Sequence, residues 1–374
     1  MAIDSGVLEA RHKGARKTKI LVIRPDRIGD VVLSTPVLEA LRHNYPDAEL
    51  QLLVRDVVVP VVQHNPFVTK IFVYSPDSTH SGFGGFWRLV RQLQAERFDI
   101  AITLQVSFRI TVALAIAGIR YRVGPYSKWY SYLCFNRGTR QSRSAVEMHE
   151  TDYNLMLLRK LGIRTPSRKF EPTITVDADG KERMRVLVRG LGIPDGATFV
   201  TIHPGMGGSA LNWTEGYYVD LVARLAARGV RVIVTGGIHE KPLVERVVAA
   251  AKGRGAELPI YVFLGANSPT GLADMIALLS LAQVMVAPST GPLHIAAALG
   301  KRTVSFYSPI KVQSAIRWGP YAADESKHSV LVPDALCGQD FKCAGRKCHF
   351  YFCMERLGVD EALNSVMSQL EKSK

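Results

Sequence analysis

The sequence has no apolar stretch long enough to cross a membrane. Its longest, residues 110–119, is about half the length that a membrane helix needs. Residues 1–19 lack the apolar core of a secretory signal peptide, so we expect the protein to work in the cytosol. Disordered and fibrous classes are also excluded, because 47% of the residues are hydrophobic and 21% are charged.

Cysteine is scarce until the last tenth of the chain. Four of the five cysteines lie there, at spacings of C-x5-C-x4-C-x4-C: Cys337, Cys343, Cys348 and Cys353. The segment lacks the C-x2-C pair of many zinc sites, although His349 lies within it. We therefore predict packed, reduced thiols and keep a zinc site as the alternative.

Acidic residues are too few to balance the basic ones. The chain has 47 Lys and Arg residues against 33 Asp and Glu, which gives a formal net charge of +14. Such an excess favours a polyanionic partner, which can be a nucleic acid, an anionic membrane or a phosphorylated substrate. Composition does not choose among these three.

The two halves of the chain repeat one pattern. Short apolar runs alternate with segments of helical period, which indicates parallel strands joined by crossover helices. Strands are predicted at residues 19–24, 49–54, 70–74, 98–104, 198–203, 230–235, 260–264, 284–287 and 302–307. Helices are predicted at residues 31–43, 217–229, 272–282 and 292–299. With a linker over residues 163–179, this pattern predicts an α/β fold of two doubly wound, Rossmann-like domains facing across a cleft.

One loop after a predicted strand has the residues of a diphosphate cradle. In Ser289-Thr-Gly-Pro-Leu-His294, Pro292 suits a first helical position and Gly291 lets a ligand approach the backbone closely. The amides at the start of a helix, together with its dipole, bind anions. The alternative is an ordinary capped helix with His294 in the core.

Two further loops also follow predicted strands. The glycines of residues 203–208 resemble a phosphate loop, and a plain turn is the alternative. Residues 24–30 place Asp30 at a helix start, where the helix dipole favours an ionised carboxylate that can act as a general base. A simple charge at a helix N-terminus is the alternative. The Asp177-Ala-Asp179 pattern lies in the linker, so no metal site is predicted from it.

Together these segments resemble glycosyltransferase family nine, the ADP-heptose:lipopolysaccharide heptosyltransferases. The resemblance covers roughly residues 18–370. It rests on residues 20–24, 29–36, 46–48, 203–205, 213, 235–237, 289–300 and 353–354. It implies a GT-B fold and an inverting, metal-independent transfer of heptose from ADP-heptose to the lipopolysaccharide inner core, without a cofactor. Residues 1–170 would bind the acceptor and residues 171–374 the nucleotide sugar, at the cytoplasmic face of the inner membrane.

The resemblance also assigns roles to residues. Asp30 would be the catalytic base. Donor contacts would come from His203, Pro204, Gly205, Met206, Glu240, Thr270, Leu272, Ser289, Thr290, Gly291, Pro292 and His294. Contacts to the anionic acceptor would come from Arg27, Arg55, Arg120, Arg122, Arg137, Arg140 and Arg143, most of them in a basic loop over residues 120–143. The alternative for this loop is a solvated segment without a ligand.

Two positions depart from the family pattern. Leu211 stands two residues before Trp213, where well-known members have a lysine that grips the donor phosphate. Ser289 stands where members have an aspartate that contacts the sugar. A transferase of the same fold with another nucleotide sugar or acceptor, and a nucleotide-sugar epimerase, therefore stay open. The non-enzyme alternative is a basic nucleic-acid-binding protein, although no RRM, KH or zinc-finger pattern accompanies the arginines.

Overall fold

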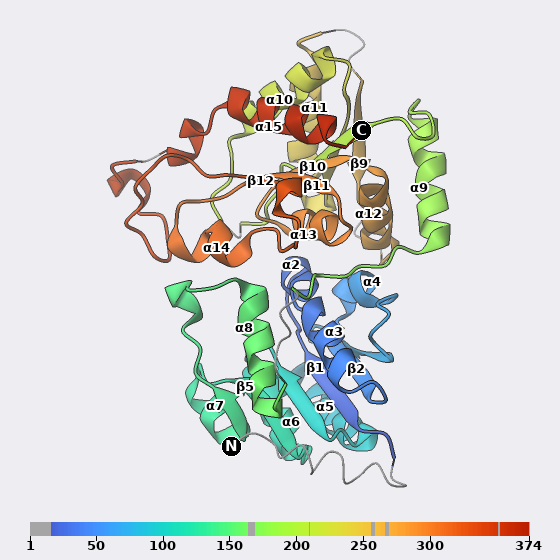
Figure 1. Cartoon of the computed structure of the whole chain (residues 1–374), viewed down its shortest axis with the longest axis vertical. Helices are drawn as coiled ribbons and strands as arrows, with labels where there is room; N and C mark the ends of the chain where they lie inside the picture. Colours follow the sequence, from blue (N-terminus) through green and yellow to red (C-terminus); the bar gives the residue numbers. More distant parts are fainter. Residues whose placement is uncertain are drawn as a thin grey trace. The chain divides into compact units, whose positions relative to one another are not determined.

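The computed structural model describes residues 16–163, 169–208, 210–255, 259–265, 269–350 and 352–373. The chain forms two compact units (Figure 1). Unit 1 consists of Met1–Arg143 and Glu150–Thr173, and unit 2 of Ser144–His149 and Ile174–Lys374.

Unit 1 contains a six-stranded parallel sheet in the order β3-β2-β1-β4-β5-β6. Its strands are β1 Lys19–Ile23, β2 Glu49–Arg55, β3 Lys70–Tyr74, β4 Ile100–Thr103, β5 Tyr121–Pro125 and β6 Arg137–Thr139. The central strand β1 is an uninterrupted apolar run because helices cover both faces of a doubly wound sheet. Ile23, at its end, pairs with Leu53 and Thr103, so β1, β2 and β4 end at one edge.

The helices of unit 1 cover this sheet. They are α2 Ile28–Val32, α3 Thr35–Asn44, η1 Asp56–Val58, α4 Val59–Val62, α5 Gly82–Glu96, α6 Phe108–Ile116, α7 Trp129–Cys134, α8 Glu150–Met156 and η3 Leu157–Leu161. The short turn η2 Arg143–Ala145 begins with a residue of unit 1 and continues into unit 2. Leu89 and Leu93 of α5 pack with Ile110 and Leu114 of α6 in one apolar cluster, which also includes Leu21 of β1.

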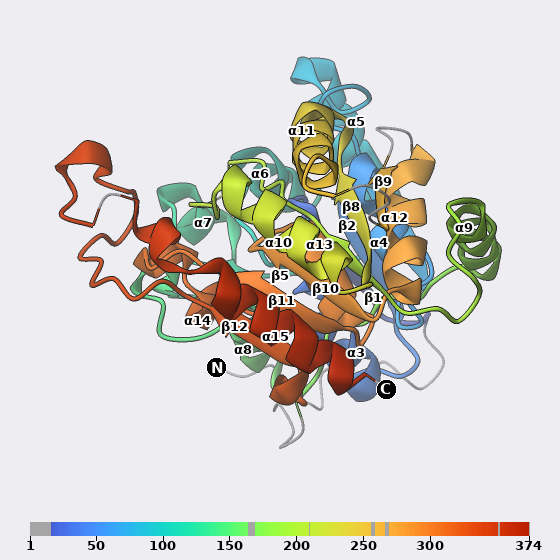
Figure 2. The same ribbon diagram turned by 90° about the horizontal axis from the view of Figure 1, so that it is seen from above.

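Unit 2 repeats the arrangement in the order β12-β11-β10-β7-β8-β9. Its strands are β7 Phe199–Ile202, β8 Arg231–Gly236, β9 Ile260–Leu264, β10 Val284–Pro288, β11 Arg302–Phe306 and β12 His328–Leu331. Its helices are α9 Ala178–Gly190, α10 Glu215–Ala227, η4 Ile238–Glu240, α11 Lys241–Lys252, α12 Pro269–Leu281, α13 Gly291–Ala298, η5 Lys311–Gln313, α14 Ala315–Trp318, η6 Glu325–Lys327, η7 Gly345–Lys347, η8 Cys353–Arg356 and α15 Val359–Glu371. The last helix, α15, packs against α10 and β11 (Figure 2).

The predicted fold of two Rossmann-like, doubly wound parallel sheets is confirmed, and every predicted strand is present. The basic segment 120–143 is not the loop that we predicted, because it contains β5, α7 and β6. Those two strands, YRVGP and RGT, are short and carry arginine and glycine, so they give no apolar run. Within the described residues, no helix combines the length and the apolarity that a membrane span requires.

The start of α9 explains the Asp177-Ala-Asp179 pattern. Asp177 is the N-cap of this helix, and its carboxylate accepts a hydrogen bond from the Gly180 amide at 3.0 Å. An aspartate in this position satisfies one of the amides that a helix start leaves without a partner. The pattern therefore belongs to a helix cap.

Candidate active site

Both sheets reverse their strand order once, and ligands of open α/β folds bind beside that reversal. In unit 1 it lies between β1 and β4, and in unit 2 between β7 and β10. The three loops that the sequence predicts as the site follow β1, β7 and β10, so all three lie at these switch points. The predicted acceptor set lies in unit 1 and the predicted donor set in unit 2.

The switch point of unit 1 contains a buried arginine that directly follows β1. The Arg24 side chain is 1% exposed, and it forms ion pairs with three carboxylates. Its Nε lies 3.0 Å from Asp26 Oδ2, its Nη1 lies 3.1 Å from Glu150 Oε1, and its Nη2 contacts Asp30 Oδ1. Burial opposes the charge of Arg24, but Asp30, Glu150 and Asp26 outweigh it and raise the pKa of the guanidinium. Arg24 is thus a permanent cation behind Asp30.

Asp30 lies in the first turn of α2, as predicted, and its side chain is 21% exposed. The Arg24 guanidinium pairs with one of its oxygens, and the exposed part of the carboxylate can accept a hydrogen bond from a hydroxyl group. Asp26 forms an ion pair with the same guanidinium. Burial raises the pKa of Asp26, and the charges of Asp30 and Glu150 raise it further, whereas Arg24 lowers it. Asp26 is therefore a less readily ionised carboxyl group than a free aspartate.

The predicted acceptor residue Arg143 is engaged inside unit 1. Its Nη1 donates to Glu150 Oε1, and its Nη2 donates to Gln141 Oε1 at 2.9 Å and to Asn154 Oδ1 at 3.3 Å. The side chain is 14% exposed. Arg143 thus supports the carboxylate network behind Asp30.

The other arginines of segment 120–143 differ in exposure. Arg120 and Arg140 are exposed, and their guanidinium groups lie 5.1 Å and 5.8 Å from the ring centres of Tyr121 and Tyr132. Arg122 instead donates from Nε to the Cys134 carbonyl at 2.6 Å, which joins β5 to the C-terminal end of α7.

Three predicted acceptor residues remain. Arg137 is half-buried, and its guanidinium lies 5.8 Å from the Tyr121 ring centre. Arg55 ends β2 and donates to Asp77 Oδ2 at 2.6 Å. Arg27 is exposed at the N-cap of α2, three residues before Asp30. Among these residues, Arg27 is nearest in sequence to the candidate base.

In unit 2 the loop after β7 is built around a buried histidine. His203 Nδ1 lies 3.1 Å from Thr235 Oγ1, and Nε2 lies 3.3 Å from Glu240 Oε2. The same Glu240 oxygen accepts from the Gly237 amide at 2.9 Å. The bond with His203 lowers the pKa of Glu240 against the effect of burial. A Cβ on Gly205 would lie 1.9 Å from Glu240 Oε1, so any larger residue here would displace the Glu240 carboxylate.

The remaining donor predictions of this region are placed as follows. The Pro204 carbonyl accepts from Asn212 Nδ2 at 2.7 Å, and Met206 is buried. Leu272 is half-buried on α12. The side chain of Thr270 lies outside the described residues.

The loop after β10 leads into α13, as predicted. Thr290 is its N-cap, and Gly291 and Pro292 form its first turn. Together with Ser289, these three residues are partly exposed. The first amides of a helix lack partners within the helix, and the helix dipole adds positive potential there. The His203 amide donates to the Val286 carbonyl of β10 at 2.9 Å, which brings the loops after β7 and β10 together.

His294 lies within α13 and is 4% exposed. Its Nδ1 has no hydrogen-bond partner in the part of the chain that the structure describes. Burial, and to a lesser extent the charge of His149, lowers the pKa of His294 to about 3. The imidazole is therefore neutral near pH 7, which fits the core histidine that the sequence left as the alternative.

Sequence reasoning missed the residues that hold Asp30. Arg24 could have been found, because a charged residue directly after an apolar strand is unusual. Glu150 and Asn154 gave no signal, since they are 126 and 130 residues away from Arg24 along the chain.

The chain is similar in sequence to known proteins. The sequence model of glycosyltransferase family 9 (heptosyltransferase) matches residues 86–346. Lipopolysaccharide heptosyltransferase 3 of Escherichia coli K12 is 25% identical over 311 residues, which cover 78% of this chain and 82% of that protein.

Solved structures show a similar fold. A glycosyl transferase family 9 protein from Veillonella parvula has a TM-score of 0.79 at 18% identity, over 95% of this chain and 97% of its own. Escherichia coli ADP-heptose lps heptosyltransferase II has a TM-score of 0.76 at 20% identity, over 95% and 99%. Escherichia coli heptosyltransferase WaaC with ADP-2-deoxy-2-fluoro heptose has a TM-score of 0.65 at 16% identity, over 96% and 100%.

Proposed function

The chain belongs to glycosyltransferase family 9, whose model matches most of it, and we propose that it is an inverting heptosyltransferase. It moves heptose from ADP-heptose to the inner core of lipopolysaccharide. Unit 1 binds the acceptor, and unit 2 binds the donor. Support for the donor comes from WaaC, whose structure was solved with an ADP-heptose analogue, and support for the acceptor from the lipopolysaccharide heptosyltransferase of Escherichia coli.

Asp30 is the general base of the proposed reaction. Its carboxylate takes the proton from an acceptor hydroxyl while that oxygen attacks the anomeric carbon of the heptose. The bond between this carbon and the diphosphate breaks, ADP leaves with the electron pair, and the configuration at the carbon is inverted. The ion pair with Arg24 holds the Asp30 carboxylate in position for this step.

The helix start of α13 holds the donor diphosphate in this proposal. The amides of Thr290 and Gly291, with the positive end of the helix dipole, offset the charge of the leaving group without a metal ion. The loop from His203 to Met206 lies at the same switch point and supplies further contacts. The geometry of α13 beside the loop after β7 is the observation that carries the proposed function.

The acceptor side rests on charge. Arg120 and Arg140 present exposed cations, and the lipopolysaccharide inner core and lipid A carry phosphates and acidic sugars. Cations near an anionic surface contribute about 1 kcal/mol each. We therefore place the protein at the cytoplasmic face of the inner membrane as a peripheral enzyme.

A ligand screen by thermal unfolding tests the donor. The full chain is heated with ADP-heptose, ADP, and UDP-, GDP- and CMP-sugars at equal concentrations. ADP-heptose at a hundredfold excess over its Kd should stabilise the fold by about 2.7 kcal/mol. Stabilisation by another nucleotide sugar alone would instead support the second candidate, a same-fold transferase with a different donor. Ser289, a neutral residue in a family position for aspartate, favours that candidate.

Metal independence is tested by turnover without divalent cations. We expect transfer to continue in brief EDTA treatment and to be unchanged by added Mg²⁺ or Mn²⁺, because helix amides neutralise the diphosphate. Strict dependence on either ion would contradict the proposed role of α13.

A further inference from the structure

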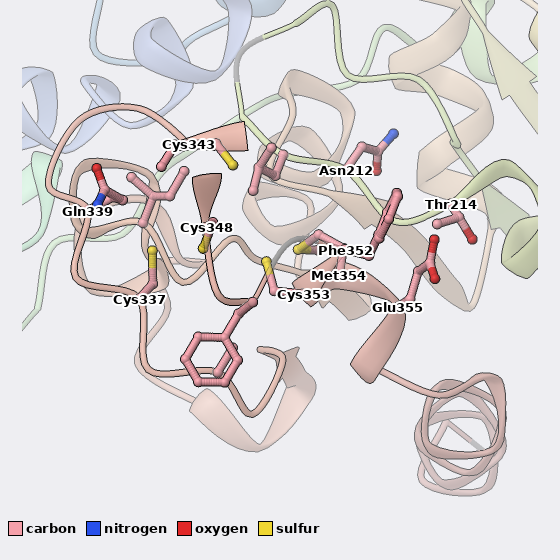
Figure 3. A pocket seen from close by; sticks show the side chains of 15 residues that line it. Asn212, Thr214, Cys337, Gln339, Cys343, Cys348, Phe352, Cys353, Met354 and Glu355 are labelled. Atoms are coloured by element: carbon pink, nitrogen blue, oxygen red, sulfur yellow. The ribbon is translucent and has the colours of Figure 1, made fainter. Parts of the chain in front are cut away.

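The four C-terminal cysteines surround one cavity. Cys337, Cys343, Cys348 and Cys353 all line a cavity of about 190 Å³ in unit 2 (Figure 3). The fifth cysteine, Cys134, is buried in unit 1. The fold of this segment thus places four thiols beside the same cavity.

These thiols are not packed as the sequence led us to predict. Cys343 is exposed, and Cys337, Cys348 and Cys353 are only half-buried. Packing requires apolar neighbours on all sides, whereas these side chains border an open cavity. All four side chains face the same cavity, so their sulfurs are open to a ligand that enters it.

The segment that carries the cysteines has little regular structure to hold it. Within the described residues 335–350 and 352–356, the helical elements are the short turns η7 and η8. The exposed fractions of Leu336, Phe341 and Phe352 are 88%, 61% and 63%. A segment that buries so little apolar surface commonly needs a covalent or metal cross-link to be stable.

Hydrogen bonds to the rest of unit 2 anchor both ends of the segment. Lys311 N donates to the Gln339 carbonyl at 3.2 Å, and Trp213 Nε1 donates to the Leu357 carbonyl at 2.8 Å. Between these anchors the Gly345 amide donates to Cys343 Sγ at 3.3 Å. An amide aimed at sulfur stabilises a thiolate, as in the outer shell of metal-bound cysteines.

We propose that Cys337, Cys343, Cys348 and Cys353 together bind one thiophilic metal ion that cross-links this segment. Four sulfur ligands without oxygen or nitrogen suit tetrahedral zinc or iron. Within the described residues, no three potential ligands stand close enough to hold a metal ion as they are placed. The proposed binding thus requires the sulfurs to move inward across the cavity, and the thiols release protons as the metal–sulfur bonds form.

The other wall of the cavity connects this site to the loop after β7. Leu211, Asn212 and Thr214 line the cavity opposite the cysteines. Asn212 also donates to the Pro204 carbonyl, in the loop to which the proposed function assigns the donor. A bound metal would thus stabilise the donor loop through Asn212. This link to the donor rests on the proposed function, whereas metal binding itself is independent of it.

The metal content of the purified full chain tests the inference. Elemental analysis should find about one zinc or iron per chain, and Cys348→Ser should lower that content at least about tenfold. Cys134→Ser removes a cysteine outside the cavity and should leave the content unchanged. A metal-free wild-type chain, or equal metal in Cys348→Ser, would overturn the proposal.

A second measurement protects the test against a variant that fails to fold. Wild-type protein, stripped of metal under reducing conditions, is titrated with Co²⁺. Tetrahedral thiolate binding should give intense absorption that saturates at one ion per chain and disappears when Zn²⁺ is added. No absorption, or disulfides found by mass spectrometry in freshly purified protein, would overturn the proposal. Neither measurement uses ADP-heptose, so the metal site can be confirmed or overturned whether or not the proposed function is correct.

Discussion

The two units share one strand order but differ in the chemistry of their switch points. In unit 1 the residue after the first strand is a buried cation, Arg24, surrounded by three carboxylates. In unit 2 the corresponding position is His203, and the loops carry glycines and helix amides. The fold fixes where a ligand is bound, while the first residues beyond each strand decide whether the site handles a proton or an anion. A substitution in one unit should therefore affect one of these tasks and spare the other.

Asp30→Asn should have the largest effect. Loss of the general base should lower kcat by about 10²-fold or more, with donor affinity and the unfolding midpoint nearly unchanged. The measurement is steady-state transfer together with calorimetric binding of ADP-heptose.

Asp26→Asn is the matched control, because Asp26 lies on the same Arg24 guanidinium. It should retain most of the activity. An inactive Asp26→Asn with an active Asp30→Asn would show that Asp26, and not Asp30, is the general base.

Gly291→Val should be next. A branched side chain at the start of α13 blocks approach to the amides, and charge-assisted hydrogen bonds contribute roughly 1.5–3 kcal/mol, so the donor Kd should rise about tenfold to a hundredfold. Direct titration with ADP measures this change. Gly190→Ala in α9, where an added Cβ meets open space, serves as the control. Unchanged ADP affinity in Gly291→Val would move the donor site away from α13.

Removal of the exposed cations of unit 1 should have a smaller effect. Arg120→Ala combined with Arg140→Ala should raise the acceptor KM by up to about thirtyfold, at about 1 kcal/mol for each charge, without a change in donor affinity. Arg185→Ala with Arg189→Ala removes two charges from α9 of unit 2 and should leave the acceptor KM alone. Equal effects of the two pairs would indicate non-specific electrostatics.

The smallest effect concerns pH and unit 2. The folded pKa of His294 is about 3, below the ordinary value near 6.5. The unfolded chain therefore binds the extra proton first, so the stability from neutral His294 is complete above about pH 6.5 and is lost as pH falls toward 3. Urea unfolding between pH 7 and 5 should show a decline of at most about 1.4 kcal/mol per pH unit from this group. His294→Gln should make the decline shallower, and an identical slope would exclude His294 as its source.

The sequence predicts those parts of the molecule whose structure depends on residues adjacent along the chain. Apolar runs locate β1, β4 and β10 because a covered parallel strand must be apolar along its length. The short edge strands β6 and β12 escape prediction, since three or four residues with polar side chains give no such run.

The candidate site divides in the same way. Asp30 and the start of α13 follow from local patterns, whereas the pairing of Arg24 with Glu150 joins α8 to the end of β1 and depends on the tertiary fold. The sequence places the four cysteines in one segment, but whether they pack or surround a cavity depends on the walls that Leu211 and its neighbours provide.

The most direct test of the division of labour between the units is the anomeric configuration of the product. The purified full chain is incubated with ADP-heptose and an inner-core acceptor, and the new glycosidic bond is examined by NMR. The account predicts a heptoside of configuration opposite to that in the donor, one ADP released per bond, and loss of both products in Asp30→Asn. A product that retains the donor configuration, or full product formation in Asp30→Asn, would contradict it.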